Sequence, residues 1–384
     1  MTTLLLVGAG HGHLYVMNHA RELAAEGYHV HLLAPRFFDY SGVASATAAG
    51  TVARDTGRVD VQALAARNSV EHHVDTLALL DLAARVARTA AGLELAFDVV
   101  SLNIGSVVAE TGTSVHPSVV RVKPLSGLAD LDARLRATSG SQGAVVAVVG
   151  GGATGVELAA HLAVRPDVAL VRLVESAPAI GGGLPAGARR RLEALLSTRR
   201  VEVQTGRAVR EIGEHRLVCE DASELTYDVA VLATGLSAPT LVAAIGLGDE
   251  RGVPVRDTLQ HVSHDDVYAV GDCARFLPVT LPRIGVHGVR QGPVLLQSLL
   301  ARARGDRLPV YEPQRRALSI LDLGGGTALA VRGRWWWFGA GALRLKELID
   351  RRWLATYRDA EQTSLRRGEP SSGRDAGTRR VPRT

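Results

Sequence analysis

The first candidate for chemistry is a glycine-rich turn whose spacing suits a bound dinucleotide. Gly150, Gly152 and Gly155 follow an apolar run and precede a helical pattern, an arrangement that permits a tight turn, close approach to a pyrophosphate and close helix packing. The helix that begins near Thr154 would point its N-terminal amides at the phosphates. Glu175, at the end of the next predicted strand, would bind the ribose hydroxyls and repel a 2′-phosphate. This pattern predicts NADH in preference to NADPH.

A second glycine turn near the N-terminus is incomplete and comprises Gly8, Gly10, His11, Gly12 and His13. Its third glycine position is occupied by a histidine, and no acid ends the following strand. Asp272, which follows Gly271 at the end of a distant apolar run, could supply the missing carboxylate for the ribityl hydroxyls of a flavin. Capping of a following helix is the alternative role for this acid. The two histidines either contact the cofactor or pack and hydrogen-bond beside the turn.

Two such turns imply two dinucleotides, a flavin at the first and a nicotinamide at the second. Hydride could then pass between them inside one chain. Three further residues that follow the ends of predicted strands join the candidate cofactor-binding set: Gly105, Thr234 and Gly235.

The elements that must position these residues predict an α/β protein with two Rossmann-like domains. Apolar runs at residues 229–232 and 267–270 suggest that the chain returns to finish the first domain, so that the nicotinamide domain is inserted into the flavin domain. The expected units are an FAD-binding domain (1–115 and 226–305), an NAD(P)H-binding domain (116–225), a small C-terminal α+β domain (306–360) and a disordered basic tail (361–384).

Composition is that of an ordinary globular protein, with 384 residues, 46% apolar and 22% charged. We see no basic leader and no uninterrupted apolar span of about 20 residues, so a cytoplasmic protein is expected. Cys219 and Cys273 lack dithiol or metal-ligand spacing, which argues against disulfide chemistry and a metal centre. The body is near neutral apart from the basic C-terminal region, and nothing favours nucleic-acid binding.

The order of the motifs resembles the two-dinucleotide flavoproteins of the pyridine nucleotide-disulfide oxidoreductase class. The matching motifs are Gly8-x-Gly10, Gly150-x-Gly152-x-x-Gly155, Ala233-Thr234-Gly235 and Tyr268-Ala269-Val270-Gly271-Asp272-Cys273. Within the class the chain is most similar to the branch fused to selenide, water dikinase, and more distantly to type II NADH dehydrogenases. Branch-level matches include Gly10-His11-Gly12-His13-Leu14, Val122-Lys123-Pro124 and Leu345-Lys346-Glu347-Leu348-Ile349-Asp350-Arg351.

The resemblance implies FAD in the first domain and NAD(P)H in the second. Glu157 is similar to a glutamate that lies near the nicotinamide and flavin N5 in type II dehydrogenases, and Lys123 would approach the flavin or pair with Glu157. The helix starting at Gly285 and Val286 would aim its N-terminal amides at the flavin pyrimidine edge. The alternative roles are an ordinary acid in the first turn of its helix for Glu157 and a solvated surface lysine for Lys123. The dehydrogenase pattern beside the quinone site is absent from this helix, so the resemblance does not fix a quinone acceptor.

A predicted C-terminal helix, residues 342–357, mixes apolar side chains with basic ones, and tryptophans precede it at 335–337. The mixture suits a helix on an anionic membrane surface. Alternatively, the helix closes the domain and the tryptophans belong to the core. Localisation is therefore expected to be cytoplasmic, with or without peripheral contact at the inner membrane face.

We expect an FAD-dependent NAD(P)H oxidoreductase that transfers hydride to flavin N5 and electrons to a small acceptor, with a quinone as the favoured acceptor. The alternatives are a flavin oxidase or tailoring reductase for another small molecule, and a redox sensor that holds both cofactors without turnover. The sequence leaves open the acceptor, the pathway, the retention of FAD, and the choice between monomer and homodimer.

Overall fold

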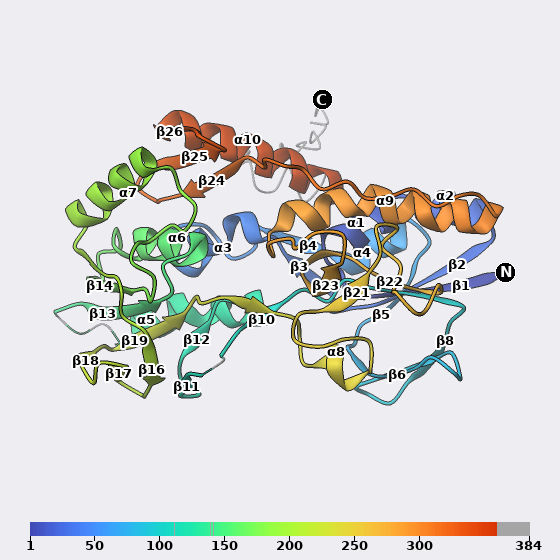
Figure 1. Cartoon of the computed structure of the whole chain (residues 1–384), viewed down its shortest axis with the longest axis horizontal. Coiled ribbons are helices and arrows are strands. Elements are labelled where there is room, and N and C mark those ends of the chain that lie inside the picture. Colours follow the sequence, from blue (N-terminus) through green and yellow to red (C-terminus); the bar gives the residue numbers. More distant parts are fainter. Residues whose placement is uncertain (111, 139, 141, 359–384) are drawn as a thin grey trace, which may run out of the picture.

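Two parallel five-stranded sheets form the frame of the structure, a computed structural model that describes residues 1–110, 112–138, 140 and 142–358 (Figure 1). Each sheet has its own hydrophobic core. The predicted α/β fold with two Rossmann-like domains is confirmed, and a C-terminal segment of strands and one long helix is present.

The first sheet is built from strands far apart in the sequence, in the order β22-β9-β1-β2-β5. These strands are β1 (Thr2–Val7), β2 (Tyr28–Leu33), β5 (Glu71–His73), β9 (Val99–Leu102) and β22 (Val267–Ala269). The central strands are nearly continuous apolar runs, as expected for a parallel sheet buried on both faces. Figure 1 shows the helices of this domain above the sheet, namely α1 (His11–Asn18), α2 (Ala20–Ala25), α4 (Val61–Arg67) and α9 (Gly285–Arg304).

On the opposite side of this sheet lies a meander of β6 (Leu77–Asp81), β7 (Val86–Thr89) and β8 (Glu94–Ala96). The segment after the first glycine turn forms two helices rather than one, and the first begins within the turn motif, at His11. The Gly/Ala/Ser-rich stretch after Tyr40 contains a 3₁₀ turn (Ser41–Val43) and α3 (Ala44–Ala48). Short pairs complete the domain: β3 (Phe37–Asp39) with β4 (Arg58–Asp60), and β21 (Val253–Val255) with β23 (Ala274–Phe276).

The second sheet has the order β12-β19-β13-β14-β15. Its strands are β12 (Val120–Arg121), β13 (Ala144–Val149), β14 (Val168–Val174), β15 (Val201–Gln204) and β19 (Val229–Leu232). Its helices are α5 (Leu131–Thr138), α6 (Ala153–Leu162) and α7 (Ala186–Thr198), and a smaller sheet comprises β11 (Ser114–Val115), β16 (Val209–Ile212), β17 (Arg216–Cys219) and β18 (Glu224–Thr226).

The pairing of β19 corrects one expectation. This strand was expected to return to the first domain, but it pairs with β13 from Val146↔Val229 onward and completes the second sheet. A buried parallel strand needs apolar residues on both faces in either sheet, so its composition could not tell the two sheets apart. The chain returns only after β19, when β20 (Leu236–Ser237) runs antiparallel to the outgoing β10 (Val107–Val108).

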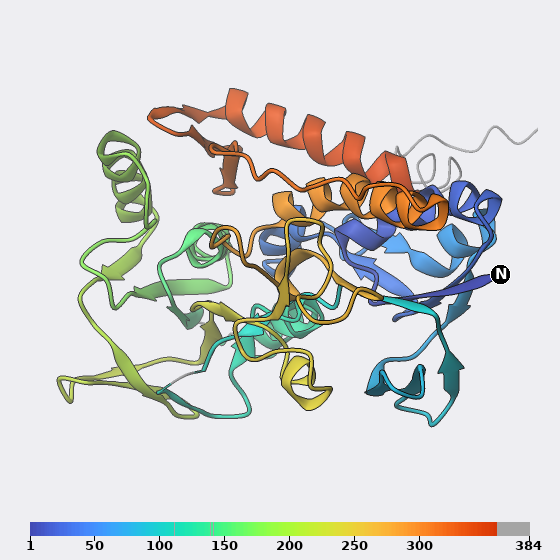
Figure 2. The same cartoon turned by 45° about the vertical axis from the view of Figure 1, so that its right-hand side comes forward.

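The C-terminal unit spans both domains. Strands β24 (Ser319–Asp322), β25 (Ala328–Arg332) and β26 (Trp335–Gly339) pack near α6 and α7, and α10 (Ala340–Tyr357) then extends over the first domain (Figure 2). The tryptophans of β26 are not core residues, because Trp335, Trp336 and Trp337 are 80%, 37% and 40% exposed. No helix among the described residues is long and apolar enough to cross a membrane. The predicted disordered tail, 361–384, lies outside the described residues.

Asn103 joins the ends of three strands of the first sheet. Its side-chain oxygen accepts hydrogen bonds from the amides of Gly12 (3.0 Å) and His13 (3.2 Å), and its side-chain amide donates to the carbonyl of Val270 (2.8 Å). The side chain is buried. One residue after β9 therefore fixes both the first glycine turn and the end of β22.

We predict that Asn103→Ala lowers the free energy of unfolding by about 2–4 kcal/mol, because it strands buried donors and an acceptor. Asn68→Ala is the matched control: this partly buried asparagine bonds only the carbonyl of Leu64, so its loss should cost about 1 kcal/mol or less. Urea unfolding followed by circular dichroism measures both variants. Equal losses would contradict the special role of Asn103.

Candidate functional site

The first glycine turn opens onto a groove of about 470 Å³ at the carboxyl ends of β1 and β9. Of the residues predicted to hold FAD or act near it, Gly8, Gly10, Gly105 and Lys123 line this groove. Gly8 has φ +84°, and a Cβ there would lie 2.6 Å from the carbonyl oxygen of Asn103. Only glycine suits such a position, and the backbone at Gly105 faces open space, as a phosphate-binding cradle requires.

His13 lies beneath the turn and does not line the groove. Its Nδ1 bonds the carbonyl oxygen of Gly8 (2.6 Å) and its Nε2 bonds the hydroxyl of Ser101 (2.8 Å). Burial lowers the pKa of His13 to about 4, opposed by the bond to Gly8. The histidine that replaces the third glycine is thus a neutral support for the turn, which favours the hydrogen-bonding alternative over cofactor contact.

His11 occupies an aromatic cluster at the start of α1. Its ring lies 5.1 Å from that of Phe38, 5.9 Å from Tyr40 and 5.0 Å from Trp353 of α10. Burial lowers its pKa to about 4, helped by the charge of Lys123 and opposed by Asp272. This histidine therefore links the C-terminal helix to the first turn.

Asp272 lies in a 3₁₀ turn (Gly271–Cys273) beside the same groove. Its Oδ2 accepts a hydrogen bond from Ser106, a groove-lining residue, at 2.8 Å. The capping alternative does not hold, since β23 rather than a helix follows the turn. The amide of Gly271 donates to Gln291 of α9 at 2.7 Å. Asp272 is thus held at the groove edge, where a carboxylate can meet ligand hydroxyls.

The N-terminus of α9 approaches the first turn. Gly285 lies next to His11 and Ser41, since a Cβ there would be 3.5 Å and 3.6 Å from them. Gly12 packs against Val270, where a Cβ would lie 2.9 Å from a methyl group. Neither Gly12, Gly285 nor Val286 lines the groove in its present shape. Their cofactor contacts stay predictions.

The second glycine turn opens onto a groove of about 600 Å³. The predicted residues that line it are Gly150, Gly152, Thr154, Glu175, Thr234 and Gly235. No atom lies within 4 Å of a Cβ placed on Gly152 or Gly235, so the backbone is open to a phosphate at both. Gly155 faces away from the groove, and a side chain there would overlap the carbonyl of Gly150. This is the predicted close packing of helix on strand.

Glu175 is fixed at the rim of the second groove. One carboxylate oxygen accepts from the amide of Gly151 at 2.5 Å and the other from the amide of Ala177 at 2.7 Å. Arg207, which sequence reasoning missed, lines the same groove. Arg172, the arginine near Glu175 in sequence that could have met a 2′-phosphate, instead bonds Glu202 on the neighbouring strand. An arginine after β15 gave no sequence signal for a ligand.

Glu157 and Lys123 meet at a smaller cavity of about 80 Å³ between the grooves. Lys123 also lines the first groove, while Thr154 and Thr234 also line the second. The carboxylate of Glu157 accepts a hydrogen bond from the amide of Asp322, at 2.8 Å, rather than from Lys123. The structure therefore brings both predicted catalytic residues to the junction of the two grooves.

The environment of Glu157 favours its protonated form. Burial raises its pKa to about 7; Lys346 and the bond from the amide of Asp322 oppose this rise, and the charges of Asp322 and Asp350 add to it. A carboxyl group with this pKa can take up or release a proton near neutral pH.

Two buried residues of α10, Lys346 and Asp350, act electrostatically on Glu157 and were missed as site residues. Lys346 donates to the carbonyl of Gly42 and to Asp350 (2.6 Å), and Asp350 accepts from the hydroxyl of Tyr40 (2.9 Å). A helix that lies on a membrane through its basic residues would expose Lys346, but this side chain is only 9% exposed. Its rarity was a signal, since Lys123 and Lys346 are the two lysines of an arginine-rich sequence.

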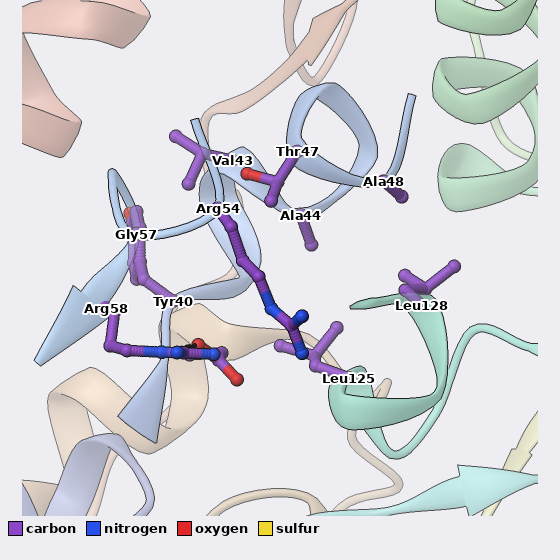
Figure 3. A pocket seen from close by; sticks show the side chains of 11 residues that line it. Tyr40, Val43, Ala44, Thr47, Ala48, Arg54, Gly57, Arg58, Leu125 and Leu128 are labelled. Carbon is purple, nitrogen blue, oxygen red and sulfur yellow. Dashed lines mark hydrogen bonds and ion pairs between the residues drawn. The ribbon is translucent and has the colours of Figure 1, made fainter. Parts of the chain in front are cut away.

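A further small cavity lies between residues 39–58 and the 3₁₀ segment Leu125–Asp130. Figure 3 shows the side chain of Arg54 reaching from one wall toward Leu125 on the other. The volume of about 40 Å³ suits one or two water molecules rather than a cofactor. This cavity is a neighbour of the junction, not a third ligand groove.

Two curated proteins are similar in sequence to part of this chain. A nitric oxide reductase FlRd-NAD(+) reductase from Salmonella arizonae is 30% identical over 45% of this chain and 51% of its own. A type II NADH:quinone oxidoreductase from Haemophilus influenzae is 31% identical over 34% of this chain and 33% of its own. The matched part thus spans about half, or less, of these curated relatives.

Similarity of structure covers more of the chain than these sequence matches do. The sulfide:quinone oxidoreductase of Aquifex aeolicus superposes with a TM-score of 0.80 at 17% identity, covering 95% of this chain and 94% of that one. Residues 2–292 match the family described as pyridine nucleotide-disulphide oxidoreductase. With its two glycine turns and their grooves, the chain belongs to the pyridine nucleotide-disulphide oxidoreductase family.

Proposed function

We propose that this chain is an FAD-dependent NADH oxidoreductase that delivers electrons to a small acceptor, a quinone. The observation that carries the proposal is the junction cavity, which shares Lys123 with the first groove and Thr154 and Thr234 with the second. When bound, FAD accepts a hydride from the nicotinamide of NADH and passes the electrons on.

The chain itself supplies binding, orientation and proton control. The turns at Gly8 and Gly150 bring backbone amides to the two pyrophosphates, and Asp272 and Glu175 bind hydroxyls of the two cofactors. Glu175 favours NADH, because its charge would face a 2′-phosphate. Arg207 in the same groove offsets only part of that repulsion. NADPH is therefore expected to be a weaker substrate than NADH, but not an excluded one.

Glu157 holds a proton at the junction. Its Oε1 accepts from the amide of Asp322, and burial raises its pKa to about 7. Reduction of a quinone consumes protons as well as electrons, so a carboxyl group that exchanges protons near neutral pH is useful beside the cofactors. Lys123 places a positive charge at the same cavity and favours a reduced, negatively charged ring.

Two relatives support the choice of acceptor, since their names include NADH:quinone and sulfide:quinone oxidoreductase. The Salmonella relative is named as a reductase of FlRd, which favours a small redox protein as the second candidate acceptor. Dithiol or sulfide chemistry has little support here: both cysteines are buried, and burial raises the pKa of Cys273 to about 12.

The C-terminal unit supports contact with a membrane surface, where a quinone would be found. Trp335 and Trp337 on β26 are exposed, as are Leu348 and Ile349 on α10. Tryptophan prefers the interface between water and lipid. We propose that this surface, the β26–α10 face, lies peripherally on an anionic membrane.

Anaerobic mixing with NADH tests the proposed function. NADH should reduce the flavin in a single turnover and so bleach its absorbance, and NADPH should do so more slowly. A soluble quinone should then reoxidise the flavin and restore the absorbance rapidly. Flavin that stays reduced with every acceptor would favour the sensor alternative. Fast reoxidation by oxygen but not by quinone would favour an oxidase. A protein that takes up no FAD would refute the proposal.

Glu157→Gln should remove a specific pH dependence. The folded protein holds this proton more tightly than the unfolded chain, so the contribution of Glu157 to stability declines, with its own slope, as pH rises from 4.5 to about 7. In the variant, which still accepts the bond from Asp322, this slope should disappear, and quinone reduction should lose its dependence on pH near 7. Glu347→Gln, on the exposed side of α10, is the control. Unchanged pH profiles in Glu157→Gln would exclude the proton role.

Vesicle binding tests the β26–α10 face. The double variant Trp335→Ser, Trp337→Ser should bind anionic lipid vesicles about tenfold more weakly than wild type in co-sedimentation. Val74→Ser with Leu79→Ser removes exposed apolar side chains at and before β6, which lies on the opposite side of the molecule from β26 and α10 (Figure 1), and should have no effect. Equal binding by all three proteins would refute the contact.

A further inference from the structure

Three histidines and a glutamate gather on one face of the first sheet. His29 and His31 lie two residues apart on β2, and Glu71 and His73 lie two residues apart on the parallel edge strand β5. The register pairs His31 with Glu71. Because side chains two residues apart on a strand share a face, all four project to the same side. This is the side away from α9, since Tyr28, which precedes His29, reaches the carbonyl of Leu299 in that helix.

The side-chain atoms of this cluster are close enough to share one ion. His29, His31 and Glu71 each offer one ligand atom, and these atoms lie within 4.8 Å of one another. The carboxylate of Glu71 is 3.5 Å from His29 Nε2 and 3.7 Å from His31 Nδ1. His73 Nε2 lies 3.0 Å from His31 Nδ1 and 3.5 Å from the second oxygen of Glu71.

We propose that His29, His31 and Glu71 bind a divalent transition-metal ion of the Zn²⁺ class, with His73 or water as the fourth ligand. Bonds of about 2.0–2.1 Å in a tetrahedral site place neighbouring ligand atoms about 3.3–3.4 Å apart. The separations of 3.5 Å and 3.7 Å from the Glu71 carboxylate exceed this by only a few tenths of an ångström. The two histidine ligand atoms lie within 4.8 Å of each other, and rotation of the half-exposed His29 ring can bring them closer.

The ligand chemistry selects the class of ion. Neutral imidazole nitrogens and one carboxylate suit Zn²⁺, Co²⁺, Ni²⁺ or Cu²⁺, whereas Mg²⁺ and Ca²⁺ prefer oxygen ligands. His31 and His73 are largely covered, with side chains 16% and 15% exposed, and His29 and Glu71 are about half exposed. The site is therefore preformed on its inner side and open to solvent on its outer side.

An ion here would fasten a weak edge of the sheet. β5 has three residues, and it pairs within the first sheet with β2. The chain continues from β5 into Asp75 and Thr76, which line the first groove. None of the four cluster residues lines either groove, so this site is independent of the proposed oxidoreductase function.

Isothermal titration calorimetry of the full-length, FAD-loaded and chelator-treated protein tests the site with Zn²⁺. Wild type should bind one Zn²⁺ with a Kd of about 10 µM or below, and Mg²⁺ should give no saturable heat. His29→Gln and Glu71→Gln, both at half-exposed positions where the fold should tolerate change, should each weaken binding on the order of a hundredfold.

His264→Gln is the matched control, because His264 stacks on His261 in a histidine pair elsewhere in the chain. It should bind Zn²⁺ like wild type. A thermal-unfolding series adds a second readout: Zn²⁺ should raise the Tm of wild type and control but not of the two cluster variants. No saturable Zn²⁺ binding, or binding unchanged in both cluster variants, would overturn the proposal and leave the histidines as a hydrogen-bonded row.

Discussion

Close approach of backbone to backbone at the two glycine turns is the constraint on which both grooves depend. At the first turn, a side chain on Gly8 would lie against the carbonyl of Asn103. At the second, one on Gly150 would overlap the carbonyl of Ala233. Each turn is thereby held against the end of a neighbouring strand, and its amides face outward over the sheet edge. A larger residue at Gly8 or Gly150 would push the turn away from the strand and so distort the groove beside it.

The two turns reach this geometry by different means. The second relies on glycine alone, because Gly155 lets α6 close onto β13. The first lacks that glycine, and His13 instead bonds both the carbonyl of Gly8 and the hydroxyl of Ser101. A buried hydrogen-bonding ring thus replaces close packing. This compensation explains how a damaged sequence pattern can still produce an intact turn.

Sequence reasoning recovered what depends on local pattern and missed what depends on distant partners. The glycine turns and Glu175 were located because each belongs to a short strand–turn–helix signature. Glu157 and Lys123 were named only through the family resemblance, and the structure brings them to one cavity while their catalytic roles stay predictions. The placement of β19 was wrong, because a buried parallel strand looks alike in either sheet. Asn103, Lys346 and the groove-lining Arg207 were missed, since their positions depend on contacts between segments that no local pattern records.

The split of the first domain sets an order for its completion during synthesis. The second sheet is made entirely of strands between Val120 and Leu232, so it can close once that stretch has left the ribosome. The first sheet waits for β22, and its helical cover waits for α9. The N-terminal half of the first domain therefore spends that interval with β9 as an unpaired edge of apolar residues. The first domain is therefore begun before the second sheet and completed after it. During synthesis the edge of β9 is where association with a chaperone would shield the most vulnerable apolar surface.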